Sequence, residues 1–150
     1  MDFVKLATDV TVFLTPFFPY LILAGEEAAK EAGKKFGSTA WEKAASLWNS
    51  IKNFSKGDIK MKRTVESLAE DPDDEDFQLI LAKLLAKQFE LSPELATELI
   101  NRMKDDKAIQ TVIIENESKA KNIYQRLSKG GVQKTVVRDK SEVDDITQDM

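Results

Sequence analysis

The chain has 150 residues, of which 42% are hydrophobic, and a net charge of −4. This composition fits one modest domain, or a smaller domain with a tail, and does not support general nucleic-acid binding. Because cysteine and histidine are both absent, the chain lacks a disulfide framework, a thiol nucleophile, and the commonest metal ligand and general base. We therefore expect a protein that is not an enzyme and that uses no cofactor or metal ion.

The first predicted element is an apolar segment near the N-terminus. Residues 10–25 carry no charge, and as a helix they extend roughly 24 Å, somewhat less than the ~30 Å hydrocarbon core of a bilayer. No basic region precedes them, so we do not expect a secretory signal. Thr15 followed by Pro16 predicts a helix start, and Pro19 predicts a kink or a delay of one turn.

This segment has two interpretations. It is either the central core helix of a bundle, or a helix that is buried at rest and inserts into a membrane later. Large apolar side chains followed by small residues at every fourth position favour close helix approach in lipid. The residues assigned to membrane insertion are Val12, Phe13, Phe17, Phe18, Leu21, Leu23, Gly25, Ala29 and Gly33.

Helix-capping signals divide residues 1–105 into four or five amphipathic helices. These signals are Gly37 as a stop, Thr39 with Glu42 as a capping box, Asp58 as a cap, Asp71 before Pro72, and Ser92 before Pro93. The predicted fold class is therefore mainly α, with a helical bundle in this part of the chain.

A basic stretch interrupted only by Asp58 lies near the middle of residues 1–105. It comprises Lys52, Lys56, Lys60, Lys62 and Arg63. Such a stretch is either an ordinary solvated face or a patch that binds anionic lipid headgroups.

The pattern changes in residues 106–150, where one motif is written twice. Residues 109–125 align with residues 132–148 at an offset of 23, with four identities and matching apolar positions. Both copies begin with β-branched runs, "IQTVII" and "VQKTVV", which favour strands. Seven acidic and seven basic residues lie from Ile109 onward. This tail therefore has no net charge that would keep copies of it apart.

Charged residues of the first copy each align with a residue of opposite sign in the second. In-register parallel strands would otherwise stack like charges about 4.8 Å apart, at roughly 1 kcal/mol per contact. Two complementary copies make each column alternate in sign, within one molecule or between molecules. The pairs are Glu115 with Arg138, Glu117 with Lys140, Lys119 with Glu142, and Lys121 with Asp144.

The tail is therefore predicted to form a two-repeat β-solenoid with open edges that template further copies. Its core positions are Ile109, Val112, Ile114, Asn116, Ser118, Ala120, Ile123, Val132, Thr135, Val137, Asp139, Ser141, Val143 and Ile146. Two alternatives stay open: a small β-hairpin or sheet packed on the helical bundle, and a disordered tail.

The paired copies, with their Asn/Asp-x-Ser core and opposed charges, resemble the two-repeat amyloid signalling motif of the fungal HET-s type and its bacterial counterparts. The resemblance covers about residues 107–149. It departs from the fungal pattern in the short spacer 126–131 and in the glutamines that end both copies. In such proteins a helical membrane-attacking domain precedes the motif, called HeLo in fungi and Bell in bacteria, and residues 1–105 look similar to the Bell kind.

The resemblance implies a cell-death or anti-phage effector triggered by amyloid templating. The expected partners are further copies of this chain, a receptor of the NLR type with a matching motif, and membrane lipid on activation, but no nucleic acid. The protein would be cytoplasmic at rest and membrane-associated when activated. The alternative is a polymerising scaffold or adaptor whose helical bundle binds another protein.

Overall fold

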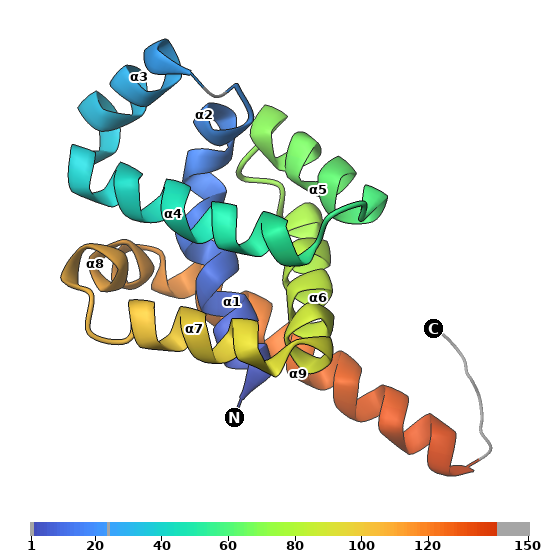
Figure 1. Ribbon diagram of the computed structural model, residues 1–150. Coiled ribbons are helices and arrows are strands. Elements are labelled where there is room, and N and C mark those ends of the chain that lie inside the picture. Colours follow the sequence, from blue (N-terminus) through green and yellow to red (C-terminus); the bar gives the residue numbers. More distant parts are fainter. Residues whose placement is uncertain (1, 24, 141–150) are drawn as a thin grey trace.

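The protein is described by a computed structural model that covers residues 2–23 and 25–140, with the backbone alone for residues 130–140. The predicted mainly α fold is confirmed (Figure 1). In chain order the elements are α1 (Phe3–Leu14), a 3-10 turn η1 (Thr15–Phe17), α2 (Phe18–Leu23), α3 (Glu26–Phe36), α4 (Ser38–Phe54), α5 (Ile59–Glu70), α6 (Glu75–Leu91), α7 (Pro93–Met103), α8 (Lys107–Glu115) and α9 (Glu117–Lys140).

Helix α1 lies at the centre of the bundle, where it packs against α4, α6, α7, α8 and α9 (Figure 1). Its sequence, FVKLATDVTVFL, is apolar on more than one face, which suits a helix surrounded on several sides. Leu6, Ala7, Val10, Phe13 and Leu14 enter the main hydrophobic core.

The N-terminal helix begins earlier than the sequence predicted. Asp2 caps α1, since its carboxylate accepts a hydrogen bond from the Lys5 N–H at 3.0 Å. Thr15 is not a helix cap: its buried hydroxyl donates to the Thr11 carbonyl at 2.6 Å. Pro16 lies in the 3-10 turn, where its missing N–H is tolerated, so the chain stays helical through residue 23.

The later caps are partly as predicted. Asp58 caps α5 by accepting from the Met61 N–H at 3.1 Å, which confirms that prediction. Asp74, and not Asp71, caps α6 by accepting from the Phe77 N–H. Which acid of this run caps α6 depends on where the chain turns toward the core. Gly37 separates α3 from α4 at φ 92°, a conformation that favours glycine, so no side chain caps α4 and the predicted capping box is wrong.

Seven α-helices occupy the described residues up to Met103, more than the four or five expected. The additional boundaries are the 3-10 turn and Gly25, whose φ of 95° ends the first helical stretch. An aromatic cluster closes this end of the bundle: the Phe17 ring lies 5.4 Å from Phe13 and 4.5 Å from Phe36 between centroids.

The first copy of the tail is helical in this structure. Residues 109–114 belong to α8, so the strand interpretation, and with it the β-hairpin alternative, is wrong for this state of the chain. The physical reason is that Ile109 and Ile113 lie one helical turn apart and both reach the main core. Burial of an amphipathic face outweighs the modest β propensity of branched residues.

The bundle therefore continues past the expected boundary at residue 105. Helix α9 packs against α1 and α6, and its backbone extends into the second copy as far as Lys140. Ser141, Glu142, Val143, Asp144 and Ile146 lie outside the described residues. The β-solenoid concerns an assembled state of the tail and stays a prediction.

Candidate functional site

The first copy of the tail and the spacer after it lie over α1. We call residues 107–127 the latch. Ile109 and Ile113 are buried in the main core, whereas Ile123 and Leu127 join a second apolar cluster with Val12 of α1 and Ala82 of α6. Full burial of such side chains is worth about 1.5–3 kcal/mol each, so these four contribute roughly 6–12 kcal/mol as an upper estimate.

Polar contacts line the outer edge of the latch. The Tyr124 hydroxyl donates to an Asp2 carboxylate oxygen at 2.9 Å, and the pKa of Asp2 is lowered, first by the Lys5 N–H and then by this hydroxyl. Three further contacts reach the loop before α6 and its first turn: Lys119 to Asp73 at 3.1 Å, Asn122 to Glu75 at 3.1 Å, and Arg126 to Asp76 at 3.7 Å. Exposed pairs of this kind contribute about 0–1 kcal/mol each. The apolar contacts therefore dominate the attachment.

Asp106 anchors the start of the latch. Its carboxylate accepts from the Ile109 N–H at 3.1 Å, which caps α8, and it pairs with the Lys43 ammonium of α4 at 2.8 Å. The Lys43 ammonium, with the Ile109 N–H, holds the pKa of Asp106 below its ordinary value of 3.8. This residue therefore ties the tail to the bundle by charge as well as by capping.

Acid should weaken this anchor. A carboxyl whose pKa is lowered by folding adds stability above pH 3.8, and that stability is lost as the pH falls through the lowered value. We expect Asp106→Ala to reduce the free energy of unfolding by about 1 kcal/mol near neutral pH, and by less at about pH 2.5. Urea unfolding of both proteins at the two pH values measures this, and an equal difference at both would contradict it.

Several residues assigned to the β-solenoid core are engaged in the latch. Ile109 and Ile123 are 1% and 2% exposed, Ala120 packs against the second cluster, and Lys119 pairs with Asp73. By contrast, Ile114 is 67% exposed. Because a β-strand places these side chains on different faces than a helix does, the latch and a β-assembly cannot form at the same time from the same segment.

A small pocket lies beside the junction between α8 and α9. A cavity of about 170 Å³ lies there, with Val12, Val112 and Lys119 among its lining residues. Asn116 separates the two helices, and its amide donates to the Val112 carbonyl at 2.9 Å.

Beneath the latch lies a stretch long and apolar enough to cross a membrane, Phe3–Leu23, whose most apolar 18-residue window has a mean hydropathy of 1.6. Of its most apolar 18-residue window, 61% is buried inside the bundle, as in the core helix of a soluble protein. Its two charged residues, Lys5 and Asp9, pair with each other at 2.8 Å. The hydroxyls of Thr8 and Thr15 donate to carbonyls of the same helical stretch. These polar groups would keep their partners if the stretch left the bundle.

The residues assigned to membrane insertion are placed unequally. Val12, Phe13, Phe17 and Phe18 are buried, Leu21 is half-buried, and Leu23 is 73% exposed.

In the resting bundle, the small residues at every fourth position do not form the buried face of a helix. Gly25 precedes α3, which instead buries Ala28 and Ala32, so Ala29 and Gly33 are offset from the buried face. No atom approaches within 4 Å of the position of a Cβ at Gly33. The acidic and basic residues of α3 also end the apolar segment.

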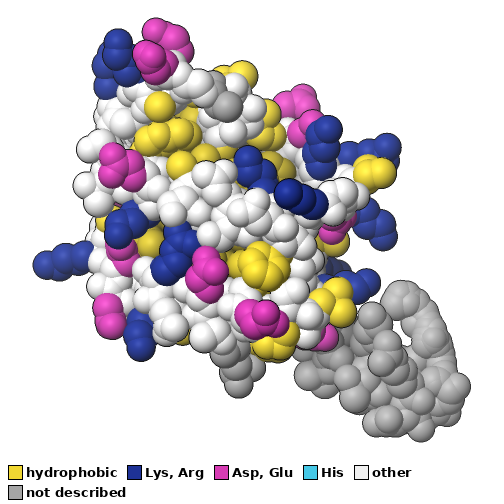
Figure 2. All heavy atoms as spheres, viewed as in Figure 1, with side chains coloured by type: hydrophobic (Ala, Val, Ile, Leu, Met, Phe, Trp, Pro, Cys, Tyr) yellow, Lys and Arg dark blue, Asp and Glu magenta, His cyan; other side chains and the backbone are white. Residues whose placement is uncertain are grey.

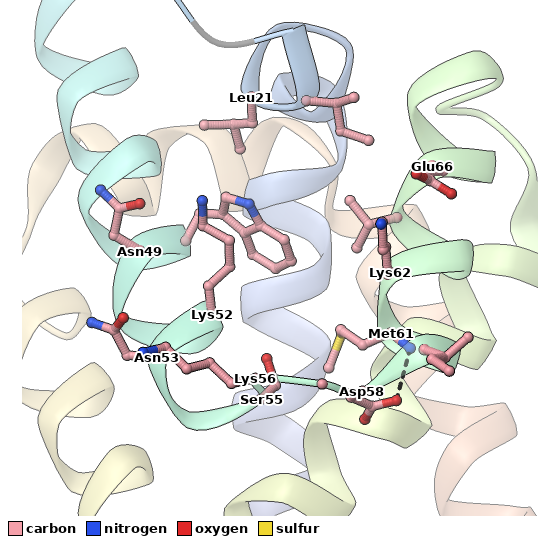
Figure 3. A pocket seen from close by; sticks show the side chains of 15 residues that line it. Leu21, Asn49, Lys52, Asn53, Ser55, Lys56, Asp58, Met61, Lys62 and Glu66 are labelled. Atoms are coloured by element: carbon pink, nitrogen blue, oxygen red, sulfur yellow. Dashed lines mark hydrogen bonds between the residues drawn. The ribbon is translucent and has the colours of Figure 1, made fainter.

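All five residues of the basic stretch are exposed, and three of them line an open groove that sequence reasoning missed. Lys52, Lys56 and Lys62 lie along this groove between α2, α4 and α5 (Figure 3). The clustering of charge in the sequence was a signal, but the apolar floor comes from three separate elements. Among the residues that the structure describes, no group of three acidic side chains is placed to hold a metal ion.

Comparison with known proteins gives no identification. No family model, curated protein or solved structure matches this chain. The assignment of function therefore rests on the latch, the apolar N-terminal stretch and the duplicated tail.

Proposed function

We propose that this protein is a cell-death or anti-phage effector, not an enzyme, which amyloid templating of its tail switches from a resting bundle to a membrane-permeabilising form. The trigger is a receptor with a matching motif, of the NLR type by family resemblance. The protein is cytoplasmic at rest and associates with the membrane when activated.

The observation that supports this proposal best is the position of the latch. The segment that resembles the signalling motif is packed on the stretch that is apolar enough to cross a membrane, through Ile123, Leu127 and Val12. Conversion of the tail to a β-assembly would withdraw these side chains from α1. A signal received by the tail is thereby coupled to exposure of the N-terminal stretch.

The sequence of events follows from this coupling. The matching motif of the receptor, in its β-form, pairs with the tail. The latch unfolds and adds to it as further β-strands, and the new open edge recruits further chains. Assembly raises the local concentration of the helical bundles attached to the tails. Phe3–Leu23, freed on the face that α8 and α9 covered, then inserts into the nearby bilayer.

A polymerising scaffold is the second candidate function. The observation that favours it is the burial of Phe3–Leu23, at 61% of its most apolar 18-residue window, which equally suits a permanent core helix. In a scaffold the tail polymerises in the same way, but α1 stays in the bundle.

Dye release from anionic liposomes separates the two functions. The full-length protein is mixed with liposomes and then with sonicated fibres of a peptide that spans residues 105–150. An effector releases dye only after seeding, whereas a scaffold forms fibres and releases none. If the protein releases dye before seeding, and adding fibres does not increase that release, templated activation is contradicted.

Two acids at the end of the apolar stretch should abolish this leakage. The double variant Ile22→Asp, Leu23→Asp changes side chains that are 39% and 73% exposed, so the resting fold is spared. It leaves residues 10–21 as the uncharged run, about 18 Å as a helix, against a hydrocarbon core of ~30 Å. Seeded fibre growth, followed by thioflavin fluorescence, should be unchanged.

The matched control is Ile80→Asp, Leu91→Asp, which places two acids at side chains that are 41% and 71% exposed outside the apolar stretch. It should leak dye like the unmodified protein. Equal leakage from both double variants would rule out insertion of the N-terminal stretch.

A further inference from the structure

A groove with a volume of about 1020 Å³ opens between α2, α4 and α5, on the side of the bundle away from the latch (Figures 1 and 3). Small-molecule sites typically occupy about 300–1,000 Å³. This groove is thus slightly above that range. It takes no part in the proposed coupling between tail and α1.

The floor of the groove is apolar. Leu21 and Ile22 come from α2, Trp48 from α4, and Met61 and Val65 from α5. Trp48, Met61 and Val65 are nearly buried, at 8%, 3% and 3% exposure, whereas Ile22 at the edge is 39% exposed. The floor is therefore lined by apolar side chains that are largely packed, and the exposed apolar surface lies at the rim formed by Ile22.

Lysine side chains line the part of the groove that lies beside the apolar floor. Lys52 from α4, Lys56 from the following turn and Lys62 from α5 line it together (Figure 3). None of the three forms an ion pair with any residue in the described part of the chain. Of the two acids at the groove, Asp58 is already engaged as the cap of α5, and Glu66 lies farther along that helix.

Lysines and apolar side chains thus lie side by side over α4 and α5 (Figure 2). A ligand that satisfies this surface must carry one compact negative charge joined to a hydrocarbon chain. An extended acidic peptide would instead place polar backbone groups on the apolar floor without hydrogen-bond partners, which is unfavourable.

We propose that the groove binds a single anionic phospholipid, with the phosphate at Lys52, Lys56 and Lys62 and an acyl chain on the floor formed by Leu21, Trp48 and Met61. The site goes beyond the proposed permeabilisation, since it binds lipid in the resting bundle and needs neither seeding nor insertion. Its position at the end of Phe3–Leu23 would place the bound lipid beside that stretch.

Trp48 reports on binding directly. The chain has two tryptophans, so the full-length Trp41→Phe variant leaves Trp48 as the only indole. Lysophosphatidylglycerol is added below its micelle concentration, and the emission of Trp48 should shift and saturate at one lipid per chain. Zwitterionic lysophosphatidylcholine and glycerol phosphate should each bind at least tenfold more weakly, because one lacks the net charge and the other the acyl chain.

Charge reversal tests the position of the phosphate. Lys52→Glu, Lys62→Glu should weaken binding tenfold or more, whereas the control Lys83→Glu, Lys87→Glu, on the exposed face of α6, should not. Circular dichroism checks that both variants stay folded.

The following outcomes would overturn the proposal: no change in Trp48 emission, equal affinity for the zwitterionic lipid, or equal loss in both double variants, which would mean surface adsorption only. Glycerol phosphate as strong as the lipid would mean a free-phosphate site. An acidic peptide that binds more tightly than the lipid would mean a protein-docking groove.

Discussion

Replacing Leu127 with aspartate should make the protein leak anionic liposomes without any seed. Leu127 of α9 is 8% exposed and packs with Val12 of α1 and Ala82 of α6. Truncation of such a side chain costs about 2 kcal/mol or more, and a charge at the same place costs further. Each 1.4 kcal/mol changes an equilibrium tenfold, so the population with a detached latch should rise by at least about 30-fold.

A substitution at Leu127 alters the latch without altering either copy of the repeat, because Leu127 lies in the spacer 126–131. The β-forming residues 109–125 and 132–148 are therefore unchanged in the variant, and fibre growth should be at least as fast as in the unmodified protein. Lys129→Asp is the control, since it adds an acid two residues later on an exposed part of the same helix. Unseeded dye release is the measurement. If Leu127→Asp stays silent until seeded, α9 does not restrain the N-terminal stretch.

Exchange of two charges within the first copy should slow fibre growth tenfold or more. Glu117→Lys, Lys121→Glu leaves the net charge unchanged but sets the introduced lysine against Lys140 and the introduced glutamate against Asp144 in the predicted stack. Two repulsive columns at roughly 1 kcal/mol each account for this magnitude. Glu117 and Lys121 are exposed and form no ion pair within the described residues, so the resting bundle should be little affected.

The second copy should then rescue the first. Adding Lys140→Glu and Asp144→Lys restores opposite signs in both columns, and the quadruple variant should assemble at the original rate. Its fibres should seed themselves but seed the unmodified chain poorly, because two of the four charge columns repel at each mixed contact between the two copies. Thioflavin kinetics with all four seed combinations measures this. A quadruple variant as slow as the double variant would mean that the register is wrong.

Much of the fold follows from local signals in the sequence. Asp58 caps α5 as predicted, and Pro93 opens α7, because caps and proline act within one turn. The choice of Asp74 over Asp71 could not be predicted, since every acid in that run is able to cap and tertiary packing decides.

The tail shows where local propensity is insufficient. The run "IQTVII" is β-branched, yet Ile109 and Ile113 also have the spacing of one helix face, and the core beneath α8 selects the helix. Both periodicities are present in the same residues. A segment with this double pattern is suited to a protein whose tail changes conformation, which is why the strand prediction and the observed helix are compatible with the proposed switch.

The candidate site was predicted only in part. Val12 and Phe13 were recognised as apolar residues of a single segment, but the latch was not, because Leu127 lies in a spacer to which no role had been assigned. The groove joins Leu21, Trp48 and Met61 from three helices. Such long-range arrangements depend on tertiary contacts that no local pattern encodes.

A reversible cross-link between α9 and α6 tests the central claim, that the tail must leave the bundle for the protein to act. The chain has no cysteine, and the Arg126 and Asp76 side chains approach to 3.7 Å outside both copies. Asp76→Cys, Arg126→Cys is joined with a reducible bifunctional maleimide and seeded in the presence of liposomes. We expect no dye release while the link is intact and full release once it is reduced. Undiminished release from the linked protein would contradict the account.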